Sequence, residues 1–185
     1  MYLLFFRMKM ISIILVLWVC FFSSSMGGEK IEWTEDYNLQ WTDFKATTAV
    51  GSGFVASTSS GIAYSYSYKE VNGDKKIKIN VVCNFYPQKS WYSKNDATDY
   101  ILKHEQTHFD ISELYKRIFK KRIDATQFSD DMKKELEVLF YQTEHERVAM
   151  QRKFDSEADH SKNKKKELEW ETYVAQQLVA YERWK

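Results

Sequence analysis

Residues 100–122 read YILKHEQTHFDISELYKRIFKKR, and this stretch decides the second half of the fold. It contains neither Gly nor Pro, the residues that most often interrupt a helix. Its apolar residues recur at the three- and four-residue spacing of a helical face. Asp96 is a candidate N-cap, with Asp99 three residues later. We therefore predict one long helix from residue 100 to about residue 122.

The predicted helix carries the motif His104-Glu105-Gln106-Thr107-His108. Positions four apart on a helix are separated by about 40° around the axis and by roughly 6 Å along it, so His104 and His108 would point the same way. Two imidazoles at this spacing can bind one zinc ion. Glu105 lies on the flank of the same face, where its carboxylate could reach a metal-bound water without being a ligand. The spacing therefore predicts the zinc site of a hydrolase.

Catalytic zinc usually has three protein ligands and a water, so a third ligand must come from another part of the chain. We expect it to be His160, because a side chain from the loop before the last helix would approach both histidines from another direction. Glu113 is the alternative, although it lies about 140° around the helix from His108. Asp110 and Asp155 are expected to accept a hydrogen bond from an imidazole or to form salt bridges.

The first half of the chain has the pattern of a small sheet. All six Gly and the only Pro lie before residue 88. Residues 64–68 and 76–81 alternate with a period of two, and Asn72-Gly73 lies between them. Alternation around an Asn-Gly pair predicts a β-hairpin, whose first strand we place within residues 53–68. A further short strand is expected near residues 31–41.

The second half has the pattern of helices. Besides residues 100–122, we predict helices at about residues 130–153 and from about residue 161 onward, where Trp170, Val174 and Leu178 fall on one stripe. The fold class expected is α+β, with a small antiparallel sheet packed on about three helices. The zinc ion is expected between the first helix and the loop around His160.

The first 25 residues differ from the rest of the chain. Arg7 and Lys9 precede an apolar run at residues 11–22, and small residues follow, which is the pattern of a secretory signal peptide. The run is shorter than the roughly 20 residues of a membrane span, so we predict a secreted or periplasmic protein rather than a membrane-anchored one. Cleavage would leave one domain, residues 26–185, with Cys83 as its only cysteine. We expect that thiol to be buried.

The charge of the chain argues against one class of partner. Lys and Arg number 27 and Asp and Glu number 26, which gives a formal net charge of +1. Such a balance produces no strong field to attract a polyanion. We therefore do not expect a nucleic acid as partner.

Residues 102–117, beginning LKHEQTHFDI, resemble a bacterial family of unknown function that is predicted to contain secreted zinc-dependent proteases. The similarity extends over most of the mature chain, although Phe154 and Ala158 stand where the family usually has Tyr and Thr. The resemblance implies export, a zincin-type active-site helix and a role for His160. Further landmarks similar to that family are Ser90-Trp91, Phe154-Asp155 with His160, and Glu169-Trp170.

The function expected from these residues is hydrolysis of a peptide or protein substrate by a metal-activated water, with Glu105 as general base. Donors for the oxyanion could come from His145, Tyr141 or Tyr173. The alternative is an exported, zinc-stabilised binding or scaffold module of the cell envelope, in which the same ligands are structural. Closed four-ligand coordination would favour the module, whereas an open water position beside Glu105 would favour the enzyme.

Overall fold

The structure is a computed structural model that describes residues 28–47, 53–71 and 74–185. The predicted signal peptide, residues 1–25, lies outside the described residues. Across the described ranges, no helix combines the length and apolar character needed to cross a membrane.

The elements follow the order expected of an α+β chain, with strands first and helices last. They are β1 (Ile31–Glu32), β2 (Ala56–Ser57), β3 (Ser60–Val71), β4 (Asp74–Phe85), β5 (Trp91–Tyr92), α1 (Asp99–Ala125), α2 (Met132–Glu157) and α3 (Lys164–Ala180), with short 3₁₀ helices at Trp41–Asp43, Pro87–Lys89 and Glu182–Trp184. One antiparallel sheet has the order β1-β4-β3, and β2 pairs with β5 in a second one. The α+β class with a small antiparallel sheet and three helices is confirmed.

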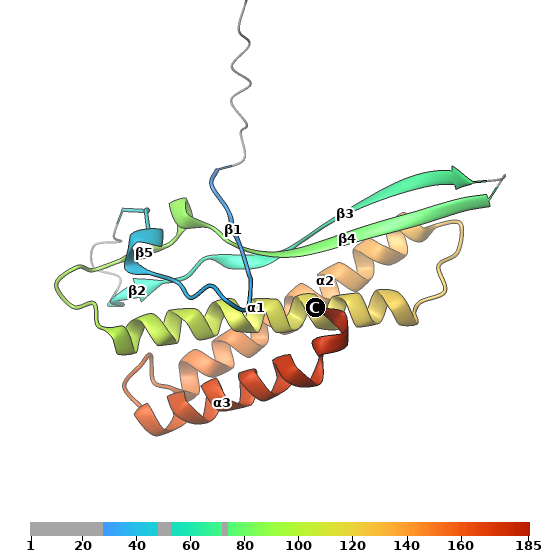
Figure 1. The fold of residues 1–185 in the computed structure, drawn as a ribbon. Helices are drawn as coiled ribbons and strands as arrows, with labels where there is room; N and C mark the ends of the chain where they lie inside the picture. Colours follow the sequence, from blue (N-terminus) through green and yellow to red (C-terminus); the bar gives the residue numbers. More distant parts are fainter. Residues whose placement is uncertain (1–27, 48–52, 72–73) are drawn as a thin grey trace, which may run out of the picture.

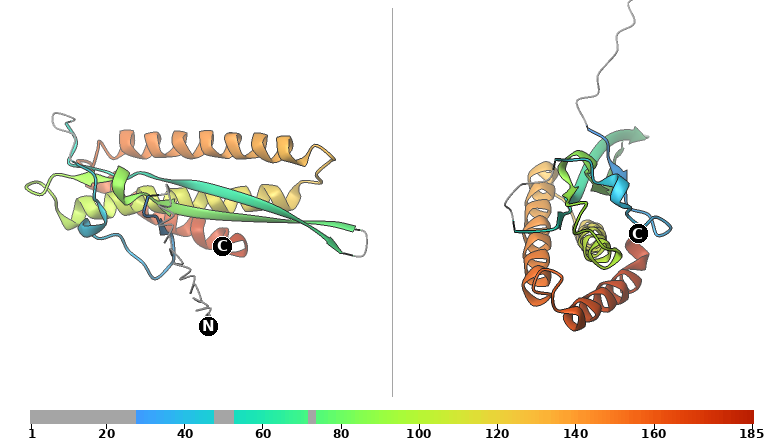
Figure 2. Two further views of the ribbon diagram at one scale, coloured as in Figure 1. Left: turned by 90° about the horizontal axis from the view of Figure 1, so that it is seen from above. Right: turned by 90° about the vertical axis from the view of Figure 1, so that its left-hand side faces the viewer.

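Helix α1 is the centre of the molecule. The long β3–β4 hairpin runs along one side of this helix (Figure 1). Helices α2 and α3 cover two other sides of it, as the end-on view in Figure 2 shows. Because α1 is covered from several directions, its buried residues are not confined to one stripe. They include Phe109, Ile111, Leu114 and Phe119, but also the motif residues His104 and Glu105.

The predicted hairpin is confirmed, and its strands are longer than the alternating runs. The register pairs Ser60 with Phe85 at one end and Val71 with Asp74 at the other. The connecting residues Asn72 and Gly73 lie outside the described residues. The strand expected near residues 31–41 is reduced to the two residues of β1, because the chain turns at Thr34, whose carbonyl oxygen accepts a hydrogen bond from the Tyr37 amide at 3.3 Å.

The helix boundaries differ from the predicted ones in ways that matter for the site. Thr98, not Asp96, caps α1, and its hydroxyl accepts a hydrogen bond from the Ile101 amide at 3.2 Å. Helix α2 continues to Glu157, one turn beyond the predicted end. The additional turn is held by Phe154, which is fully buried, and by Glu157, whose carboxylate accepts a hydrogen bond from Trp170 Nε1 at 2.9 Å. Asp155 therefore lies on a helix rather than in a loop.

Cys83 lies in a core cluster under the hairpin, as expected for a structural thiol. Cys83 is completely buried, and the other buried members of its cluster are Leu39, Phe44, Phe85 and Phe109. It forms no disulfide with any described residue. Burial raises the pKa of the Cys83 thiol, because a thiolate loses its hydration there. A thiol in this state is a poor nucleophile.

We therefore expect Cys83 to react with a thiol reagent only after the domain opens. In a Cys20→Ser chain, labelling of Cys83 should be roughly 5000-fold slower in buffer than in denaturant, since opening a domain costs on the order of 5 kcal/mol. Stopped-flow labelling with a chromogenic disulfide measures both rates. Comparable rates in the two conditions would mean that the thiol is accessible in the folded protein.

Candidate metal centre

The motif histidines lie one turn apart in the first half of α1 and point the same way, as predicted. The two rings are 4.8 Å apart and the Nε2 atoms are 3.2 Å apart. His104 is only 4% exposed, and His108 is partly buried. Two ring nitrogens that face each other at this distance can share a proton or bind one cation.

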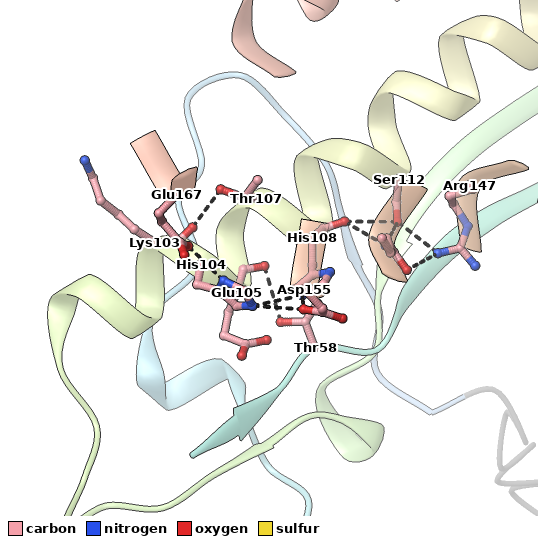
Figure 3. A network of polar contacts seen from close by, with 11 residues as sticks. Thr58, Lys103, His104, Glu105, Thr107, His108, Ser112, Arg147, Asp155 and Glu167 are labelled. Carbon is pink, nitrogen blue, oxygen red and sulfur yellow. Dashed lines mark hydrogen bonds and ion pairs between the residues drawn. The ribbon is translucent and has the colours of Figure 1, made fainter. Parts of the chain in front are cut away.

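The third group at this point is the carboxylate of Asp155, from the last turn of α2. Its Oδ1 atom lies 3.2 Å from His104 Nε2 and 2.9 Å from His108 Nε2 (Figure 3). One ligand atom from each of the three residues lies within 4.8 Å of the others. This group could hold a metal ion.

The distances within the group fit a small divalent cation. Zinc binds nitrogen and oxygen ligands at about 2.0 to 2.2 Å, so two ligands at tetrahedral angles are about 3.3 Å apart. The three separations between His104, His108 and Asp155 are 3.2, 3.2 and 2.9 Å. Shifts of a few tenths of an ångström would therefore accommodate the ion.

Glu105 supplies an independent test of the fit. Its side chain is 4% exposed and lines the same cavity as the three candidate ligands. The Oε2 atom is buried and has no hydrogen-bond partner among the described residues. A buried carboxylate oxygen without a donor is costly, and a water held by a neighbouring cation is such a donor.

A carboxylate from α3 holds His104 from the other side of the ring. Glu167 is 1% exposed, and its Oε1 atom lies 2.8 Å from His104 Nδ1 (Figure 3). The Tyr100 hydroxyl donates to Oε2 of the same carboxylate at 3.5 Å. The contact of Nδ1 with Glu167 orients the ring so that Nε2 faces Asp155 and His108, and Nε2 is the atom that would bind a metal in place of a proton.

A pattern in the sequence marks Glu167, which was not among the predicted site residues. The apolar stripe of α3 contains Trp170 and Val174, and Glu167 continues it one turn toward the N-terminus. A carboxylate on the buried face of a helix needs a buried partner. The stripe therefore indicates a paired acid at this position, although it does not identify His104 as the partner.

An aromatic ring fixes both imidazoles. Phe154 stacks on His104 with centroids 4.5 Å apart and contacts His108 edge-on at 5.1 Å. On its other side it packs against Trp170 of α3 at 5.7 Å. The imidazoles are therefore held by packing from α2 as well as by the carboxylates.

The electrostatics of the group favour positive charge. Burial alone would lower the pKa of His104, but the hydrogen bonds to Asp155 and Glu167 outweigh it and raise the pKa to about 9. Burial likewise acts to raise the pKa of Asp155, yet the two histidines hold the pKa of that carboxyl well below its usual range. Carboxylates converging on two imidazoles stabilise a bound proton, and they would stabilise a divalent cation in its place.

His160 lies in the same cavity but outside the group of ligand atoms. It is exposed, its backbone φ is 48°, and its ring packs edge-on against Phe54 at 4.9 Å. Because α2 continues through Glu157, Asp155 and not the following loop is placed at the imidazoles. The ligand role expected of His160 stays a prediction, and Asp155 is the better placed side chain.

The other acidic candidates on α1 serve other parts of the fold. Glu113 is fully buried and accepts hydrogen bonds from Lys116 and Arg117 at 3.1 and 2.9 Å. Asp110 accepts hydrogen bonds from Trp33 Nε1 and Gln106 Nε2, both at 2.8 Å, and so fixes the N-terminal segment to the helix. Neither belongs to the group of ligand atoms found among the described residues.

The cavity over the histidines has a volume of about 460 Å³. The expected oxyanion donors Tyr141, Tyr173 and His145 are exposed elsewhere and are not among the described residues that line this cavity, so they are not placed to donate there.

The strand β2 borders the cavity, and the Thr58 hydroxyl next to this strand donates to the backbone oxygen of Glu105 at 3.3 Å. The lining comes from five segments: Gly53, Phe54, Val55, Ala56, Ser57 and Thr58; Trp91; Ile101, His104, Glu105 and His108; Val148, Gln151, Arg152 and Asp155; and His160, Ser161 and Lys162.

Metal analysis should distinguish the two candidates for the third ligand. Protein loaded with zinc and desalted is expected to retain about one ion per chain, in keeping with a three-ligand site. His104→Ala and Asp155→Ala should lose it, whereas His160→Ala should keep it. Loss in His160→Ala together with retention in Asp155→Ala, both measured by plasma mass spectrometry, would reverse the assignment.

Removing the charge of Glu167 should weaken metal binding without removing a ligand. For Glu167→Gln we expect about 10- to 100-fold lower zinc affinity, because His104 loses the acceptor that orients its ring. Competition with a chromophoric chelator measures the change. Glu169→Gln is the matched control, since Glu169 is exposed and pairs only with Lys166. Equal affinities for the two variants would rule out the orienting role.

Comparisons with known proteins return no relative: no protein-family model matches the chain, no curated protein matches it, and no solved structure matches its fold. The resemblance to secreted zinc-dependent proteases therefore stays a prediction, and the chemistry of the centre has to be argued from its own residues.

Proposed function

We propose that this protein is a zinc-dependent peptidase in which His104, His108 and Asp155 hold the metal and Glu105 is the general base. The observation that carries the proposal is the buried carboxylate of Glu105, whose Oε2 atom has no partner among the described residues and which lines the cavity of the three candidate ligands. A hydrolytic site needs a base beside the ligands that is not itself one of them.

The ligand set supports zinc as the metal. Two imidazoles and one carboxylate are the protein ligands of several catalytic zinc sites, and three ligands leave a fourth position for water. The same set also occurs in non-haem iron oxygenases. The buried Glu105 favours hydrolysis over oxygen chemistry, because an acceptor for a proton is what hydrolysis requires. Three ligands with an open position also favour an enzyme over the alternative of an exported zinc-stabilised module.

The chemistry divides between the metal and the side chains around it. Zinc bound here would lower the pKa of a water toward neutrality and polarise a peptide carbonyl. Glu105 would accept a proton from the attacking water at Oε2 as the water oxygen bonds to the peptide carbonyl carbon, and would donate that proton to the amine nitrogen as the C–N bond breaks. Glu167 and Phe154 keep His104 in place meanwhile, through the contacts at Nδ1 and on the ring face.

The strand β2 supports a peptide as the substrate. Within the described ranges β2 pairs with β5 alone, and Ala56 and Ser57 line the cavity. An extended peptide can add to such a strand through backbone hydrogen bonds. It would then lie across the cavity above Glu105, which Thr58 ties to the end of the strand. The predicted signal peptide would place this activity in the periplasm or outside the cell.

Replacing the base should remove turnover while leaving the metal in place. In Glu105→Gln we expect kcat to fall by about 100- to 10000-fold, the range for loss of a positioned general base. A quenched-fluorescence peptide library with zinc-loaded protein measures activity, and metal analysis checks the content of the same sample. Glu169→Gln should retain full activity as control. Undiminished activity in Glu105→Gln would sink the mechanism, and a zinc-loaded wild type that cleaves no peptide would sink the function.

A further inference from the structure

The cavity over the candidate metal centre carries two cations with no role in the proposed chemistry. Arg152 of α2 and Lys162 of the following loop both line it and both are exposed. The acidic residues in the described lining are Glu105 and Asp155, the proposed base and a proposed ligand. The two cations are therefore left over once the metal centre is assigned.

Arg152 differs from the other arginines of α1 and α2. Arg117, Arg122 and Arg147 each form an ion pair with a glutamate at 2.7 to 3.0 Å. The Arg152 side chain has no ion pair or hydrogen bond with any described residue, and the same holds for the Lys162 ammonium. An unpaired guanidinium on a cavity wall is a ready partner for a carboxylate.

Only one lysine of the run at residues 162–166 belongs to this wall. Lys164 lies over the Tyr100 ring at 5.4 Å, and Lys166 pairs with Glu169 at 2.8 Å. Lys162 alone lines the cavity. The charge run is therefore split between a solvated helix start and one cavity residue.

The loop that carries Lys162 has a strained backbone. Asp159, His160 and Ser161 have φ angles of 48°, 48° and 68°, which lie in the left-handed region that is unfavourable for residues other than glycine. Backbone strain of this kind persists only where the surroundings enforce it, and it is concentrated at ligand sites. Here the His160 amide donates to the backbone oxygen of Asp155 at 3.0 Å, so the loop is anchored to the residue proposed as third ligand.

The positions of the two cations relative to Asp155 define where an anion would bind. Arg152 lies three residues before Asp155 on the same helix, which places both on one face. Lys162 follows from the loop anchored at Asp155. An anion between them would lie next to the metal centre, and two cations in a chain of net charge +1 suit a single carboxylate rather than a polyanion.

We propose that Arg152 and Lys162 bind a substrate carboxylate beside the scissile bond, so that the enzyme selects peptides with an acidic residue or a free C-terminus at that position. This inference rests on the proposed peptidase function. The remaining side chains of the lining include Phe54, Trp91, Ile101 and Val148, which are apolar. Arg152 and Lys162 are the only Arg and Lys in the described lining, so the charge preference is assigned to these two.

The test uses the zinc-loaded full chain and matched peptides. A peptide that the wild type cleaves is made with Glu or Gln at each position around the scissile bond, and with a free or amidated C-terminus. We expect kcat/KM to be roughly 2- to 30-fold higher for the member that places a carboxylate at the site, which is the range that two exposed ion pairs allow. Loss of the preference on amidation identifies the C-terminus, and loss on Glu to Gln exchange identifies a side chain.

Charge reversal shows whether the two cations cause the preference. Arg152→Glu and Lys162→Glu should each reduce the preference, and the double variant should abolish or invert it. Lys166→Glu is the control, because it changes the net charge equally at a residue outside the cavity lining. Equal rates for charged and neutral peptides in the wild type, or an unchanged preference in the double variant, would overturn the inference.

Failure of the peptidase function can be told apart from failure of the carboxylate site. Binding of labelled acidic and neutral peptides to zinc-loaded Glu105→Gln protein, measured by fluorescence anisotropy, needs no turnover. Tighter binding of the acidic peptide, lost in the double variant, supports the site even where no peptide is cleaved. Equal binding of the two peptides overturns it, whatever the wild-type activity.

Discussion

The carboxylate of Asp155 contacts both imidazoles of α1 within 3.2 Å, and the arrangement of the three helices depends on this contact. Buried histidines need polar partners, because burial without a partner disfavours the charged imidazolium and leaves the ring nitrogens without hydrogen bonds. Asp155 supplies one partner from α2 and Glu167 supplies the other from α3. Phe154 fills the space between them and packs on His104. A metal ion held by the two histidines would therefore be coupled to the docking of α2 and α3 on α1, and the ion and the fold would stabilise each other.

Different segments of the chain contribute different chemical groups to the lining of this cavity. The proposed substrate preference follows from where these groups lie. The candidate metal ligands and Glu105 come from α1 and α2, β2 contributes Ala56 and Ser57 to the lining, and the loop after α2 contributes Lys162. Each segment is tied to the centre by a hydrogen bond: Thr58 to the backbone of Glu105, and the His160 amide to the backbone of Asp155. The same two hydrogen bonds would therefore position both the catalytic groups and the groups that select the substrate.

Local signals in the sequence were enough for the hairpin, the central helix and the direction of the motif histidines. Alternation around Asn72-Gly73 predicted the pairing, and residues four apart on an uninterrupted helix had to lie on one face. The third ligand depended on where α2 ends, and that is decided by contacts of Phe154 and Glu157 with Trp170 of α3, which no local pattern contains. Glu167 was missed for a related reason: its place on the buried stripe is visible in the sequence, but its partner on α1 is not.

The most direct test of the account is a crystal structure of the zinc-loaded protein with anomalous data collected at the zinc edge. We predict one strong peak about 2.0 to 2.2 Å from His104 Nε2, His108 Nε2 and a carboxylate oxygen of Asp155, with Glu105 beside it and not bound to it. No peak between these residues, or a peak closed by a fourth protein ligand, would contradict the catalytic centre described above.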